Sequence, residues 1–185
     1  MPTITVKKPN VITFVYRQEK GDKDYGTCLW ARFNLDLENY SMAIESDCGN
    51  YSYQWTATPD TESFLHLCCR FEKGYLLEKF SNRSIINSDE TWKAIFEHIK
   101  EYEADISSDD LDNLKDVCFQ YTLGFSELYI ALGHTIKDLG LSDLFDFETL
   151  EYCIETDYPT NAKTIINIFL EYIVPEIRKY EEVKE

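Results

Sequence analysis

Hydrophobic and polar residues alternate with a period of two through the first third of the chain. The apolar positions of this alternation fall in four runs, at residues 12–16, 29–35, 40–44 and 51–55. Alternation of this kind predicts β-strands that bury one face. The connecting segments 19–25, 36–39 and 47–50 are rich in Gly, Asp and Asn, which favours tight turns and therefore an antiparallel meander. We expect Leu29, Phe33, Tyr53 and Trp55 on its buried face.

From residue 58 onward the apolar spacing becomes helical. Phe64, Leu67 and Phe71 form a stripe behind a helix start at 58–60, and this helix is expected to cover the buried face of the sheet. Ser107 begins a later helix as its cap. The last helix, at about 161–182, contains Pro175, which should kink it by removing a backbone donor.

These patterns together predict the α+β class. The expected architecture is a four-stranded antiparallel meander in the N-terminal third, covered by several helices that form the C-terminal two-thirds. A chain of 185 residues that is 44% hydrophobic suits one domain. We therefore expect a single domain over 1–185, with a sheet part at 1–57 and a helical part at 58–185.

The charge of the chain is unevenly distributed. Residues 1–85 carry 10 Lys and Arg against 11 Asp and Glu, a charge of −1, whereas residues 86–185 carry 8 against 23, a charge of −15. The helical part is thus strongly acidic from residue 86. Such a field repels nucleic acids and anionic membranes and attracts basic protein surfaces. A general contribution to solubility is the alternative explanation of the acidity.

Cysteine spacing and hydropathy bear on location and cofactors. The six cysteines, at 28, 48, 68, 69, 118 and 153, are scattered without a loop-like or Cys-x-x-Cys pattern. We expect free thiols, no structural metal and no cofactor. The N-terminus lacks the apolar stretch of a signal peptide, and no uncharged run approaches the roughly 20 residues of a membrane span, so a cytoplasmic location is expected.

The strongest acidic cluster is formed by Asp109, Asp110, Asp112 and Asp116. Three of these, at 109, 112 and 116, share one helical face. Converging carboxylates can hold Mg²⁺ for RNA cleavage, but acids are also favoured in a first helical turn by the helix dipole. Phosphate-binding loops, nucleophile elbows and helical zinc motifs are all missing from the sequence, so no catalytic residue is assigned and an enzyme is the less favoured interpretation. The acidic cluster is therefore the candidate site for binding a basic partner.

A second candidate site lies on the outward face of the predicted sheet. Arg17, Trp30, Arg32 and Gln54 point to that face in the expected alternation. Aromatic rings and guanidinium groups stack on unpaired bases, and Arg also binds phosphate, so these residues are candidates for RNA contact. The alternative is a second layer of helices that buries Trp30.

Four segments carry a family resemblance. They are SDCGNYSYQW at 46–55, followed by FLHLCCR at 64–70 and GYLL at 74–77, with IVPEI at 173–177 as a looser match. The chain resembles a family of small acidic phage and prophage proteins that includes type II anti-CRISPR inhibitors of Cas9. None of the matching motifs is catalytic.

The resemblance implies a function as a phage-encoded inhibitor of Cas9 in the bacterial host cell. The partner would be a basic nucleic-acid-binding protein, Cas9 with its guide RNA, met by the acidic surface, while the near-neutral sheet part contacts RNA directly. Two alternatives stay open on the sequence: an immunity protein or antitoxin that neutralises a basic toxin, and a metal-dependent enzyme that cleaves guide RNA.

Overall fold

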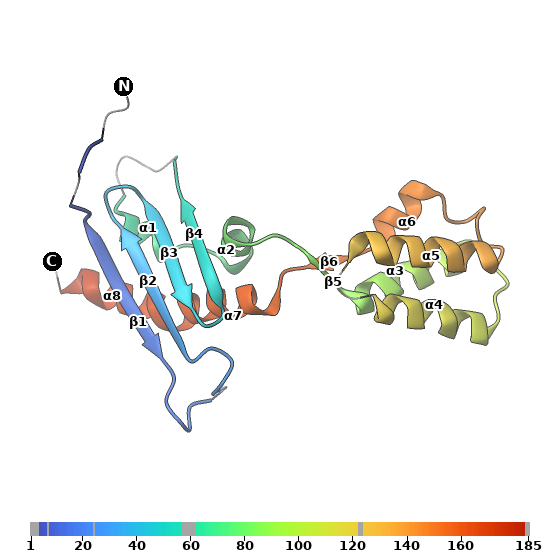
Figure 1. Cartoon of the computed structure of the whole chain (residues 1–185), viewed down its shortest axis with the longest axis horizontal. Coiled ribbons are helices and arrows are strands. Elements are labelled where there is room, and N and C mark those ends of the chain that lie inside the picture. Colours follow the sequence, from blue (N-terminus) through green and yellow to red (C-terminus); the bar gives the residue numbers. More distant parts are fainter. Residues whose placement is uncertain (1–3, 7, 24, 57–61, 122–123, 184–185) are drawn as a thin grey trace. The chain divides into compact units, whose positions relative to one another are not determined.

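The alternating residues of the first third form a four-stranded antiparallel sheet. The computed structural model describes residues 4–6, 8–23, 25–56, 62–121 and 124–183. The strands are β1 (Val11–Arg17), β2 (Trp30–Asp36), β3 (Ser41–Ser46) and β4 (Gly49–Gln54), and they pair in the order β1-β2-β3-β4 (Figure 1). The predicted meander is confirmed.

A uniform register gives the sheet one apolar face and one polar face. Phe33 of β2 lies opposite Phe14 and Ile44, and Leu35 lies opposite Ile12 and Met42. The side chains of Phe33, Leu35, Met42 and Ile44 are buried, and Trp55 follows β4 on the same face. Leu29 is 41% exposed, so its predicted place on the buried face is wrong. Leu29 precedes the first residue of β2, and its N–H bonds to the Asp47 carboxylate instead of to a neighbouring strand.

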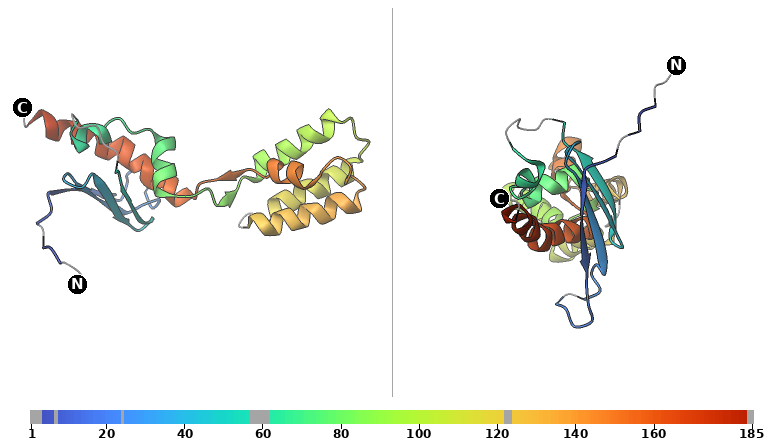
Figure 2. Two further views of the ribbon diagram at one scale, coloured as in Figure 1. Left: turned by 90° about the horizontal axis from the view of Figure 1, so that it is seen from above. Right: turned by 90° about the vertical axis from the view of Figure 1, so that its left-hand side faces the viewer.

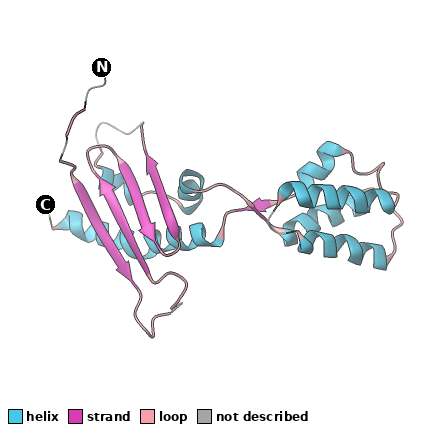
Figure 3. Ribbon diagram, viewed as in Figure 1, coloured by secondary structure: helices cyan, strands magenta, loops and turns pink. Residues whose placement is uncertain are grey.

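Helices from two separate parts of the chain cover the apolar face of the sheet. They are α1 (Phe64–Cys68), α2 (Lys73–Phe80), α7 (Thr160–Ile168), the π-helical segment η1 (Phe169–Ile173) and α8 (Val174–Glu182). The Phe169 ring contacts Phe33 at 5.7 Å between centroids, and the Trp55 ring contacts Phe64 at 5.4 Å and Phe71 at 4.9 Å. Figures 2 and 3 show these helices on one side of the strands. The sheet and this cover bury a largely aromatic and aliphatic core.

Pro175 acts on the last helix by way of a π turn. The helix continues from Thr160 to Glu182, and η1 interrupts the α-helical pattern just before the proline, where the Val174 N–H bonds to the Phe169 carbonyl. Proline has no N–H for the carbonyl four residues earlier and clashes with it, and a π turn shifts that carbonyl out of the way. The helix is thus altered just before Pro175, whereas the kink expected there stays a prediction.

Residues 83–159 form a compact unit of their own, inserted between α2 and α7. This unit, which we call the acidic unit, contains α3 (Ser88–Glu101), α4 (Ser108–Gln120), α5 (Phe125–Asp138) and α6 (Phe147–Cys153), with the short strands β5 (Ile85–Ile86) and β6 (Thr156–Asp157) paired at its base. Ile95, Leu114, Leu128 and Leu132 are fully buried in its core. Residues 1–82 and 160–185 make up the other unit, which we call the sheet unit.

The α+β prediction is confirmed, with one refinement that concerns which helices cover the sheet. The helices of the sheet unit pack on the strands, and α3, α4, α5 and α6 of the acidic unit enclose a core of their own, so the helical part at 58–185 serves two structures. The single domain expected over 1–185 stays a prediction about cooperative folding. The helix start expected at 58–60 lies outside the described residues, and the described helix begins at Phe64 after the Ser63 cap.

Candidate functional site

The acidic cluster of α4 is fixed by the helix start that the sequence predicts. The Ser107 hydroxyl caps α4 by accepting the Asp110 N–H at 3.2 Å, and it donates to the Asp110 carboxylate at 2.7 Å. Leu114 and Cys118 face the core of the acidic unit. Asp109, Asp112 and Asp116 are therefore exposed together, whereas Asp110 is half-buried and belongs to the cap.

These carboxylates belong to a larger negative surface. Residues 83–159 carry 5 Lys and Arg against 18 Asp and Glu, a formal charge of −13 out of −16 for the whole chain. In the part of the chain that the structure describes, Asp109, Asp112 and Asp116 have no ion-pair partner. Their charge is thus available to a basic partner.

The four aspartates of α4 do not gather around a common point. Among the described residues, the side chains that converge closely enough to bind one metal ion are Cys28, Asp47 and Cys48, at the end of the sheet. The arrangement on α4 therefore suits charge-based binding by a surface and gives no support to a Mg²⁺ site there.

The outward face of the sheet brings three of its four predicted residues together. Arg17 and Trp30 are directly opposite each other on β1 and β2, and Arg32 follows on β2. The Arg32 guanidinium lies 6.0 Å from the centre of the Trp30 ring and 3.9 Å from the Glu45 carboxylate. A shallow depression of about 410 Å³ runs between these side chains and Val15.

Trp30 is 37% exposed, so the alternative in which helices cover it is wrong. The helices of the sheet unit all pack on the other face, because the register places the large apolar side chains there. Gln54 is on the outward face too, but it pairs with Ser41 in the row of Val11 and Asp36, at the opposite end of the strands from Trp30. The candidate stacking surface is accordingly Arg17, Trp30 and Arg32, which we call the Arg-Trp patch.

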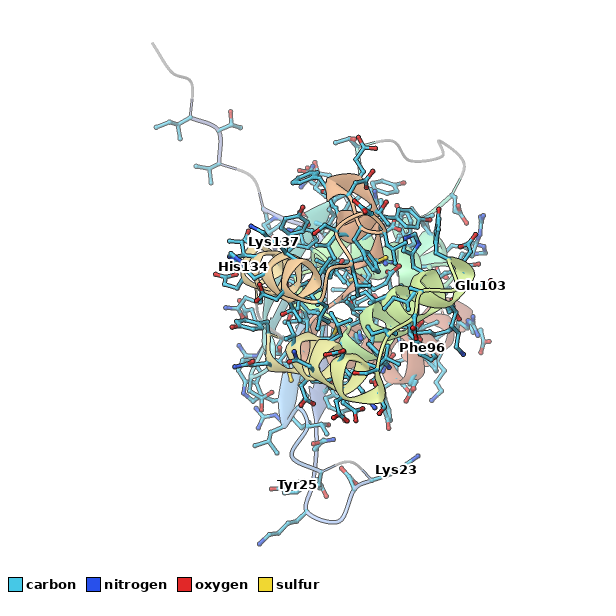
Figure 4. The ribbon with its side chains drawn as sticks, turned by 90° about the vertical axis from the view of Figure 1, so that its right-hand side faces the viewer. Lys23, Tyr25, Phe96, Glu103, His134 and Lys137 are labelled. Carbon is cyan, nitrogen blue, oxygen red and sulfur yellow. The ribbon has the colours of Figure 1, made fainter. Side chains whose placement is uncertain are left out.

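The three histidines lie on separate helices. The His66 ring is 3.4 Å from the Glu62 carboxylate in the sheet unit, and the His98 ring bonds to the Leu144 carbonyl at 2.9 Å in the acidic unit. His134 and Lys137 lie one turn apart on the surface of α5 (Figure 4). These positions suit structural and surface roles rather than a shared catalytic centre.

A row of three aromatic rings on α5 and α6, two of them exposed and one half-buried, was not predicted from the sequence. The Phe125 and Tyr129 rings stack at 6.3 Å, and the Phe147 ring contacts Tyr129 at 5.2 Å, with Phe147 66% exposed. We call these three residues the aromatic row. The four-residue spacing of Phe125 and Tyr129 was a signal for the first contact, but only the packing of α6 on α5 brings Phe147 beside them. Aromatic side chains of this kind are common anchors of protein interfaces.

The comparisons with known proteins concern the chain as a whole. The model of a phage family, Phage_phiTE_072, matches residues 6–179, nearly the entire length. No curated protein and no solved structure matches the chain. No helix of the described residues has the length and apolar character that crossing a membrane would require.

Proposed function

Because the chain belongs to this phage family, we propose that it is a phage-encoded inhibitor of the RNA-guided nuclease Cas9, which it binds through its acidic unit in the cytoplasm of the bacterial host. The partner is a large basic protein loaded with guide RNA. A phage gains from blocking such a nuclease, and inhibition by occupation of a binding channel needs no catalytic residue.

The observation that carries the proposal is the concentration of charge in one unit. A charge of −13 within residues 83–159 leaves −3 for the sheet unit, although the sheet unit contains more residues. Acidity that served solubility alone has no need to be confined to one folded part. A negatively charged unit of this kind complements a channel lined by Lys and Arg that normally holds nucleic acid.

The aromatic row gives the same unit a means of specific contact. Charge steers association and sets its salt dependence, whereas desolvated aromatic side chains supply most of the binding free energy at many interfaces. Phe125 and Phe147 are exposed, and each lies close in sequence to a glutamate of its own helix, Glu127 and Glu148 respectively. An apolar pocket rimmed by basic residues is the complementary surface.

The sheet unit contributes a separate contact in this proposal. The Arg-Trp patch offers a ring and two guanidinium groups on the outward face of the sheet, which is the chemistry that stacks on unpaired bases and binds phosphate. Guide RNA is the nucleic acid that accompanies the proposed partner. The patch is expected to bind an exposed single-stranded part of it.

A cleavage assay with purified components tests the proposed function. Cas9 loaded with guide RNA is mixed with target DNA in the presence of a micromolar excess of the protein, and both DNA cleavage and guide length are followed. The expected result is loss of DNA cleavage with the guide RNA intact. Full cleavage at this excess overturns the proposal and favours the neutralisation of another basic protein, and shortening of the guide favours an RNA-cleaving activity.

A further inference from the structure

Two cysteines and one aspartate converge at one end of the sheet. Ala31 of β2 is opposite Ser46 of β3, so continuing this register brings the start of β2 beside the β3–β4 turn, which contains Asp47 and Cys48 (Figure 1). Cys28 lies just before β2 at the same end. The sulfur atoms of Cys28 and Cys48 and a carboxylate oxygen of Asp47 all lie within 4.8 Å of one another.

The two thiols are buried and the carboxylate is accessible. Cys28 is 1% exposed and Cys48 is 4% exposed, whereas Asp47 faces solvent. The Cys28 thiol donates to Asp47 Oδ1 at 3.2 Å, and the Cys48 thiol donates to the Thr27 carbonyl at 3.1 Å. Each sulfur therefore holds a proton that an incoming cation can replace, and the third donor is open to the side from which a cation arrives.

The spacing of these atoms agrees with tetrahedral coordination. Bond lengths of about 2.3 Å to sulfur and about 2.0 Å to a carboxylate oxygen place sulfur and oxygen about 3.5 Å apart and two sulfurs about 3.8 Å apart in a tetrahedral Zn²⁺ site. The observed distance of 3.2 Å between Cys28 Sγ and Asp47 Oδ1 differs from the first value by only a few tenths of an ångström.

We propose that Cys28, Cys48 and Asp47 form a binding site for a thiophilic divalent cation of the Zn²⁺ type. Binding replaces the two thiol protons, so that one M²⁺ ion and two S–H groups give two metal–sulfur bonds and two released protons, without any change in oxidation state. Asp47 supplies a third ligand, and the fourth position is open to water. Sequence spacing could not reveal this set, because the ligands come from segments that only the meander brings together.

The site is placed to hold the Arg-Trp patch in position. The Asp47 carboxylate accepts the N–H of Leu29 at 2.8 Å and the N–H of Trp30 at 3.4 Å, which ties the start of β2 to the β3–β4 turn. An ion bound to residues on both segments strengthens this tie. The metal role is thus structural, and it is independent of whether the acidic unit binds Cas9.

Cobalt binding tests the proposal directly. Co²⁺ is titrated into the reduced full-length protein, and charge-transfer absorption from thiolate to cobalt is followed with the d–d bands that report tetrahedral geometry. We expect saturation at one equivalent, displacement by Zn²⁺ and a higher melting temperature with Zn²⁺. The Cys28→Ser and Cys48→Ser variants should lose the absorption, and Asp47→Asn should weaken binding.

Cys118→Ser and Cys153→Ser are the matched controls, because these buried thiols lie in the core of the acidic unit. Both should bind Co²⁺ like the wild type. Circular dichroism without metal establishes that each variant folds, and Cys48→Ser is the milder change because its hydroxyl can keep the bond to Thr27. The proposal is overturned if the reduced wild type shows no stoichiometric thiolate–cobalt absorption, or if this absorption persists in both Cys28→Ser and Cys48→Ser. It is also overturned if Cys28 and Cys48 form a disulfide in place of binding the metal.

Discussion

The Thr91 hydroxyl accepts the N–H of Glu155 at 3.0 Å and lies 3.4 Å from the carbonyl oxygen of the same residue. Thr91 belongs to the first turn of α3 and is completely buried, whereas Glu155 follows α6. The Asn87 N–H also bonds to the Glu155 carbonyl, at 2.9 Å. These bonds close the acidic unit by fixing its last segment to its first helix.

Replacing Thr91 by Val should destabilise the acidic unit. The change keeps the shape of the side chain but leaves the Glu155 N–H without its partner. Because this bond is only partly buried, the cost should lie at the lower end of the roughly 1–3 kcal/mol of a buried unpaired group. Thr91→Ser keeps the hydroxyl and is the control. Denaturant unfolding followed by circular dichroism measures both variants, and equal stability of Thr91→Val and wild type would contradict this account of the closure.

The stability of the acidic unit should depend on the ionisation of Asp146. This residue caps α6, and hydrogen bonds from the hydroxyl and the backbone N–H of Thr149 hold the pKa of its carboxyl below the ordinary value. A lowered pKa means that the ionised cap contributes stability above the unfolded value of about 3.9, which is lost as pH falls through the folded value.

Melting temperatures of wild type and Asp146→Asn between pH 3 and pH 7 test this prediction. The neutral amide can still cap the helix but has no charge to lose, so the variant should show a smaller fall in melting temperature at acid pH. Identical pH profiles for the two proteins would show that the Asp146 charge contributes nothing measurable.

Arg32→Ala and Arg17→Ala should weaken contact with single-stranded RNA and leave folding unchanged, because both side chains are exposed on the outward sheet face. Trp30→Ala should have the larger effect, since it removes the stacking ring. Gln54→Ala is the matched control at the other end of the same face. Crosslinking of the protein to guide RNA, compared among these variants, checks the prediction, which fails if Gln54→Ala and Trp30→Ala behave alike.

Phe147→Ala should lower affinity for Cas9 roughly tenfold, because truncating an aromatic anchor costs more than 1 kcal/mol at many interfaces. The ring is 66% exposed, so the melting temperature should change little. Tyr152→Ala on the same helix is the control, because it removes a ring that is 86% exposed and outside the aromatic row. Equal affinities of Phe147→Ala and wild type in equilibrium binding would remove the aromatic row from the interface.

Local patterns were sufficient to predict much of the fold. Alternation gave the four strands and their turns, and the Ser107 cap and the disturbance at Pro175 followed from the chemistry of single residues. The separate core of the acidic unit could not be predicted, because helical apolar stripes look the same whether they pack on a sheet or on each other. The metal-ligand set and the full aromatic row could not be predicted either, because both depend on contacts between elements that are distant in the sequence.

The candidate surfaces were predictable to different extents. The Arg-Trp patch followed from strand period, but the separation of Gln54 from it depends on the pairing register, which fixes which residues share a row. On α4 the exposed face was readable from helical spacing. Asp110 takes part in the helix cap, unlike the other three aspartates. Asp109, Asp112 and Asp116 are therefore the better set to mutate when the charge is to be removed without disturbing the helix start.

Equilibrium binding of Cas9 loaded with guide RNA, measured at about 0.15 M and about 1 M salt, tests the central claim most directly. The proteins compared are wild type, a triple Asn variant of Asp109, Asp112 and Asp116, and a control in which Glu19, Glu78 and Glu182 of the sheet unit become Gln with the same loss of charge. The Debye length falls from about 8 Å to about 3 Å between these salt concentrations, so a charge-dependent contact must weaken. We predict that wild type and control bind alike and lose affinity at high salt, and that the triple Asn variant binds about tenfold more weakly at the lower salt with a smaller salt effect. Absence of binding by the wild type, or equal affinities of the triple Asn variant and the control at both salt concentrations, would contradict the account.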